Sequence, residues 1–124
     1  MNEVLLYIGA ALAIIWGAAH LAATKSVVDG FGEITRDNRF IITQEWIAEG
    51  ITICFVGCLV IFVTALVGPQ DHASLIVYRA SAAFLLVVGL LTAGTGARTP
   101  IVPFKICPFL LTGVAVLFLL GSFV

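Results

Sequence analysis

Residues 44–67 read QEWIAEGITICFVGCLVIFVTALV, so two carboxylates, Glu45 and Glu49, stand at the start of a long apolar run. From Trp46 to Val67 the run is as long as the roughly 20 residues that a helix needs to cross the hydrocarbon core of a bilayer. Trp46 fits the aromatic belt at a membrane surface. Glu45 is then expected at the interface and Glu49 about one turn deeper, which is about 5 to 6 Å.

Three further apolar segments share the character of this run. Of the 124 residues, 61% are hydrophobic and only 10% are charged, whereas soluble domains are about 25% charged. The four segments predict an all-α integral membrane protein, a bundle of four transmembrane helices that forms a single domain over residues 1–124. The expected spans are about 4–24, 46–67, 73–96 and 106–124.

The boundaries of these spans follow from local signals. Residues 25–42 hold six of the 13 charged residues and are expected to form a polar loop resting on the bilayer surface. Asp37 or Asn38 is the expected N-cap of the second helix, which would then begin before the membrane. Pro108 is expected in the first turn of the last helix, where amide groups have no internal partners.

Small residues are spaced four apart along the first span, at Gly9, Ala13 and Gly17. At 100° per residue they share one face with His20 and Thr24. Such a face lets a neighbouring backbone approach closely, which is how helices associate in lipid. It predicts either packing within the chain or a homo-oligomer, and it directs His20 into the bundle.

The basic residues predict an orientation. The segments 25–42 and 97–105 contain five of the six Lys and Arg residues: Lys25, Arg36, Arg39, Arg98 and Lys105. Arg79 lies inside the third span and is expected to reach the headgroups. By the positive-inside rule the two segments are cytoplasmic and both termini lie outside, with the plasma (inner) membrane as the expected location.

A candidate site lies at the cytoplasmic end of this arrangement. Glu45, Glu49 and Thr52 fall within about 60° of one another on the second helix. His20 is expected at a depth similar to that of Glu49, so that the two can meet, and Thr92 and Arg98 could complete a polar site. A carboxyl group in hydrocarbon is costly unless it is compensated, and a buried carboxyl beside a histidine can take up and release a proton near neutral pH.

Structural explanations compete with this functional one. Glu45 and Glu49 lie in the first turns of the membrane run, where acidic side chains meet the positive end of the helix dipole and can pair with Arg36 or Arg39. His20 can equally serve as the donor of an interhelical hydrogen bond.

Other chemistries have weaker support. Cys54, Cys58 and Cys107 lack the CxxC spacing of redox or metal motifs and are expected to be small buried residues. His20, Glu45 and Glu49 together offer ligands suited to zinc, manganese or iron, but the Glu-x-x-His motif of metal-binding bundles is absent, so neither a metal nor a cofactor is predicted. The chain has no basic stripe for nucleic acid and no phosphate loop or nucleophile motif.

In length and four-pass layout, the chain resembles the small multidrug-resistance transporters and the DoxX-like membrane proteins. The transporters carry a coupling carboxylate in the middle of the first helix, where this chain offers only His20 near one end. Four-pass quinone and vitamin K reductases carry a CxxC pair, whereas Cys54 and Cys58 are four apart. No residue role is therefore carried over from these families.

Three functions are consistent with the sequence. The first is binding or translocation of a proton, ion or small solute through a cytoplasm-facing polar pocket around His20 and Glu49. The second is a structural or assembly role in a membrane complex, without a ligand. The third is a lipid-modifying enzyme in which these two residues act as acid and base.

Overall fold

The computed structural model describes residues 2–123, and every regular element in that range is helical. The long helices are α1 (Glu3–Ala22), α3 (Arg36–Leu66), α4 (His72–Gly94) and α5 (Val102–Phe123). A short helix α2 (Thr24–Gly30) follows α1, and a 3-10 turn η1 (Gly96–Arg98) follows α4. The four long segments are apolar enough to cross a membrane, which confirms the predicted all-α four-helix bundle.

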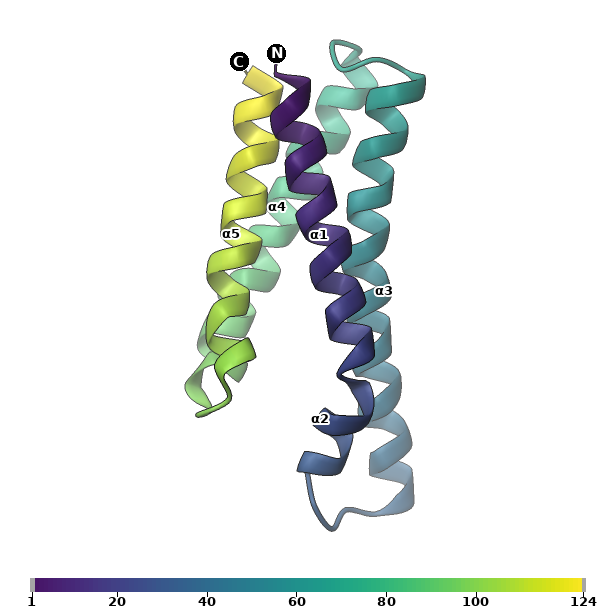
Figure 1. Cartoon of the computed structure of the whole chain (residues 1–124), viewed down its shortest axis with the longest axis vertical. Coiled ribbons are helices and arrows are strands. Elements are labelled where there is room, and N and C mark those ends of the chain that lie inside the picture. The colour runs from purple at the N-terminus through teal and green to yellow at the C-terminus, as the bar shows by residue number, and fades with distance from the viewer. Residues whose placement is uncertain (1, 124) are drawn as a thin grey trace.

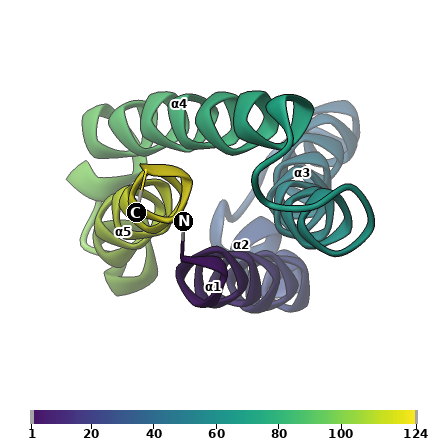
Figure 2. The ribbon, with the colours of Figure 1, turned by 90° about the horizontal axis from the view of Figure 1, so that it is seen from above.

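The four long helices form a ring in the order α1, α3, α4, α5. α1 packs against α3 and α5, and α4 packs against the same two helices from the other side. Figure 2 shows this ring seen from above. Both ends of the chain and the α3–α4 turn lie at one end of the bundle, and the α4–α5 connection lies toward the other (Figure 1).

α3 is longer than a membrane span requires. Its 31 residues measure about 46 Å at 1.5 Å per residue, against about 30 Å for the hydrocarbon core. Its first turns and α2 project beyond the α4–α5 connection (Figure 1). We call this projection, residues 24–43, the polar lobe.

The polar lobe corrects the expected loop at residues 25–42. Most of that segment is helical, and only the stretch between α2 and α3 is a turn, with Gly32 at a φ of 70° that favours glycine. The N-cap is Thr35, whose hydroxyl accepts from the amide of Asn38 at 3.2 Å, so the expected caps Asp37 and Asn38 are wrong. The loop was predicted from the charged residues of this segment. A helix that lies outside the membrane also keeps its charged side chains in water, so charge does not distinguish the two.

The last two helices also begin or end away from the expected positions. α4 ends at Gly94 rather than at residue 96, and Arg98 belongs to the 3-10 turn. α5 begins at Val102 instead of residue 106, so Pro108 lies inside the helix and not in its first turn. The missing amide of Pro108 leaves the carbonyl of Phe104 without its helical partner, which membrane helices tolerate where neighbouring helices cover the site.

The small-residue face of α1 packs inside the chain. Gly9, Ala13 and Gly17 are all buried. A Cβ atom at Gly17 would lie 2.5 Å from Cys54 Sγ, and one at Gly9 would lie 2.8 Å from the Phe118 ring. These residues therefore hold α1 against α3 and α5, and a homo-oligomer would have to use another surface.

The rest of the core is apolar, with a few satisfied polar groups. The hydroxyls of Thr64 and Tyr78 are 2.8 Å apart and join α3 to α4, and Thr64 also donates to the Val60 carbonyl. Within residues 2–123 the cysteines are unpaired, with Cys107 buried and Cys54 and Cys58 half-buried, as expected for small packing residues.

The polar lobe is held together by Asp29. Its carboxylate accepts from Lys25 on the same helix and from Arg39 Nη1 on α3 at 3.1 Å. The hydrogen bond and charge of Lys25, followed by those of Arg39, hold the pKa of Asp29 below its usual range. Asp29 thereby links α2 to the start of α3 by charge, and the apolar side chain of Val28 on α2 is buried beside it.

Acidification is expected to loosen α2. Because the folded pKa of Asp29 is depressed, its contribution is present above the unfolded pKa of about 4 and is lost as the pH falls through the folded value. Hydrogen exchange of the α2 amides, expressed as protection factors, should fall between about pH 5 and pH 2. In an Asp29→Asn variant, the α2 amides should be less protected already at about pH 5 and should lose no further protection down to about pH 2. A parallel decline of the protection factors in both proteins would show that Asp29 is not the group responsible.

Candidate functional site

The candidate site is centred on His20, in the last turn of α1. Its side chain is only 8% exposed. The imidazole ring stacks on the indole of Trp46 from α3, with ring centroids 3.7 Å apart and planes 12° apart. The histidine therefore points into the bundle, as the position of His20 on the small-residue face predicted.

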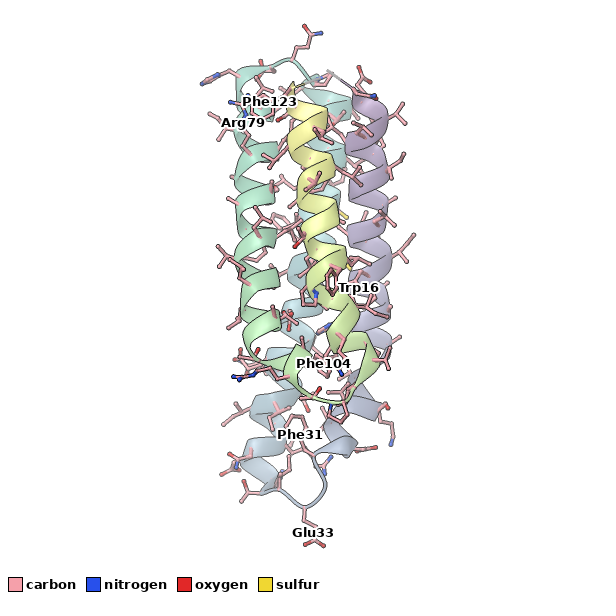
Figure 3. All side chains as sticks on the ribbon, turned by 90° about the vertical axis from the view of Figure 1, so that its left-hand side faces the viewer. Trp16, Phe31, Glu33, Arg79, Phe104 and Phe123 are labelled. Carbon is pink, nitrogen blue, oxygen red and sulfur yellow. The ribbon has the colours of Figure 1, made fainter. Side chains whose placement is uncertain are left out.

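Trp46 connects three helices at this level. Its indole Nε1 donates to the backbone carbonyl of His20 at 2.8 Å. Its ring also meets the edge of Phe104 from α5, with centroids 5.5 Å apart. Phe104 lies near the start of α5, at the α4–α5 connection (Figure 3). Trp46 thus holds the His20 ring and part of its backbone in place.

Glu49 lies beside His20 on the other side of the α1–α3 contact. Glu49 Oε2 is 3.8 Å from His20 Nε2, and the Glu49 side chain is 39% exposed. Among residues 2–123, His20 Nε2 has no hydrogen-bond partner. A distance of 3.8 Å is too long for a hydrogen bond, so this nitrogen is buried next to a carboxyl group and unsatisfied.

Glycine allows the two helices to approach at this point. A Cβ atom on Gly50 would lie 2.7 Å from Leu21 Cδ2 and 3.2 Å from His20 Cδ2. One turn along α1, Gly17 faces the Gly50 carbonyl, 2.9 Å from where its own Cβ would be. The closeness of His20 to Glu49 is therefore a consequence of backbone packing, because larger residues would separate the helices.

The other expected site residues do not join this pair. Glu45 is exposed on α3, and Arg98 is exposed in η1. Thr52 is also exposed, and its hydroxyl donates to the Ala48 carbonyl. Thr92 is half-buried, donates to the Val88 carbonyl and lies near Cys107, which borders the site.

Four residues near the site were not predicted as part of it: Trp46, Phe104, Trp16 and Cys107. Trp46 is three residues before Glu49 and Trp16 is four before His20, so the helical period contained a signal for both. Trp16 Nε1 is buried and unpaired among the described residues, and Cys107 lies near it. Phe104 carried no such signal, because residue 104 lay outside the expected last helix.

Two open grooves lie elsewhere. One, of about 590 Å³, runs between α4 and α5 and is lined by Gly89, Ala93, Lys105 and Phe109, among others. The other, of about 490 Å³, lies on the polar lobe. Within residues 2–123, no three His, Cys, Asp or Glu side chains gather as a metal site would require.

Comparison of the chain with known protein families, with curated proteins and with solved structures finds no match.

Proposed function

We propose that this chain is a proton-binding membrane protein. His20 and Glu49 would take up and release a proton as the protein moves a proton, an ion or a small solute across the bilayer. The observation that supports this proposal is the buried, unpartnered Nε2 of His20 at 3.8 Å from Glu49 Oε2. An unsatisfied buried nitrogen beside a carboxyl group can accept a proton and then share it with that group.

The exposure of the two groups suits proton exchange. The Glu49 side chain is partly exposed, whereas that of His20 is nearly enclosed. A proton can then reach the carboxyl group first and pass to the imidazole over a short distance. The indole of Trp46 stacks on the imidazole, so a protonated ring would meet an aromatic face that attracts cations.

The site would open toward the cytoplasm. Five of the six basic residues belong to the polar lobe and to the α4–α5 connection with the first turn of α5. The positive-inside rule then assigns this end to the cytoplasm of the plasma (inner) membrane and both termini to the outside.

Proton movement in sealed vesicles tests the proposal. With the purified chain reconstituted and a pH indicator trapped inside, Glu49→Gln should abolish the pH-driven flux, because the amide cannot exchange a proton. Glu45→Gln is the matched control, since it removes the same charge one turn away on an exposed position. Flux through Glu49→Gln equal to that of the unmodified chain, or equal loss in both variants, would refute the proposal.

A further inference from the structure

The groove on the polar lobe combines charge with apolar walls. It lies where the end of α1, α2 and the first turns of α3 meet, and its volume is about 490 Å³. Its lining includes the charged residues Lys25, Asp29 and Arg39 and the apolar residues Leu21, Val28 and Phe40. We propose that it binds the headgroup of an anionic phospholipid, a site separate from the His20–Glu49 pair.

The depth of the groove matches the headgroup layer. α1 has 20 residues, so it is about 30 Å long, which equals the thickness of the hydrocarbon core. Lys25 is three residues beyond the end of α1 and is the second residue of α2. Its ammonium group therefore lies beside the lipid phosphates, whichever side of the membrane the lobe faces.

The charges in the groove leave one positive charge without a counterion. Lys25 and Arg39 both donate to the single carboxylate of Asp29. Two cations and one anion give a net charge of +1, which is the complement of a phosphodiester headgroup. An ammonium has three donors and a guanidinium has five, so both retain donors for phosphate oxygens.

The side chains are also free to meet a ligand. Lys25 is 90% exposed, and Arg39 is 41% exposed. Besides Asp29, Arg39 reaches only the Gly32 carbonyl, at 3.4 Å, among the described residues. Neither cation is held in a closed network.

The apolar walls favour a lipid over a free phosphate ion. Leu21 lines the groove beside the cations and Phe40 is 62% exposed, while Val28, also in the lining, is buried. An acyl chain lying along these side chains would cover apolar surface, whereas a phosphate ion would use only the charges. Basic pockets between helices at a membrane surface bind anionic headgroups in this way.

Lipid selectivity in nanodiscs tests the proposal. Retention of phosphatidylglycerol by the purified chain is compared with that of phosphatidylcholine carrying the same acyl chains, by native mass spectrometry. The unmodified chain should prefer phosphatidylglycerol, and Lys25→Gln and Arg39→Gln should each reduce that preference about fivefold. Arg98→Gln, which removes an exposed charge in η1 outside the groove, should leave it unchanged.

Two controls separate the possible outcomes. Circular dichroism of each variant shows whether the bundle is folded, and Lys25→Gln is the milder change because that side chain is almost wholly exposed. Soluble glycerol phosphate should compete poorly with the lipid. Equal loss of selectivity in the Arg98 variant, no selectivity in the unmodified chain, or full displacement by glycerol phosphate would each overturn the proposal.

Discussion

Gly57→Ala is expected to destabilise the bundle by about 1 to 3 kcal/mol, the usual cost of forcing extra volume into a packed interface. A Cβ atom at this position would lie 2.6 Å from the carbonyl oxygen of Ala10 and 2.7 Å from Ile14 Cγ1. The first of these is backbone and cannot rotate away. α1 would have to shift from α3 along their shared face.

The measurement is the free energy of unfolding in detergent, with Gly113→Ala as the matched control. Gly113 lies inside α5, and within residues 2–123 a Cβ atom there would have no neighbour within 4 Å beyond the adjacent turns of its own helix. Alanine should therefore be neutral or stabilising at position 113, because it is the better helix former by up to about 1 kcal/mol. Equal stability of the two variants would show that close α1–α3 packing is not needed.

The same interface sets the geometry of the candidate site. Gly57 and Gly50 are seven residues apart, which is about two turns, so they lie on one face of α3. Gly50 is the residue that brings α3 against His20. A shift of α1 at Gly57 would therefore carry His20 away from Glu49, and the Gly57 variant should lose proton flux together with stability.

Much of this arrangement could be predicted because a small number of strong constraints govern how membrane helices pack. The spacing of Gly9, Ala13 and Gly17 indicated the packing face of α1, and the same face placed His20 inside the bundle. The approach of His20 to Glu49 was predicted because the two residues were expected at similar depth on consecutive membrane helices. Periodicity and span length were sufficient for both, since helix packing in lipid depends on small residues and on depth.

The rest depended on contacts that one helix cannot reveal. The segment 25–42 was expected to be largely a loop, yet it contains most of α2 and the first turns of α3, and Asp29 on α2 pairs with Lys25 and with Arg39 of α3. Trp46 was assigned to the membrane surface from its place at the start of the apolar run, and that position did not indicate that its ring stacks on His20. Glu45 and Thr52 share a face with Glu49, and they remain exposed because α1 covers only one edge of that face.

Replacing Trp46 with alanine is expected to cost about 2 to 4 kcal/mol of stability. The variant loses the stack on His20, the hydrogen bond to the His20 carbonyl and the contact with Phe104. Truncating a large aromatic side chain in a packed site costs about 3 to 5 kcal/mol, and the lower figure reflects the partial exposure of Trp46. Unfolding in detergent measures the loss.

Trp46→Phe separates the parts of this effect. Phenylalanine keeps an aromatic face over His20 but has no N–H to donate, so the expected cost is about 0.5 to 1.5 kcal/mol, that of one hydrogen bond. If the stack supports the protonated imidazole, proton flux should persist in the phenylalanine variant and fall in the alanine variant. A leucine variant provides the control, because it fills much of the space without a π face. Flux in Trp46→Leu equal to that in Trp46→Phe would show that Trp46 only fills space, and the proton-binding pair would then consist of His20 and Glu49 alone.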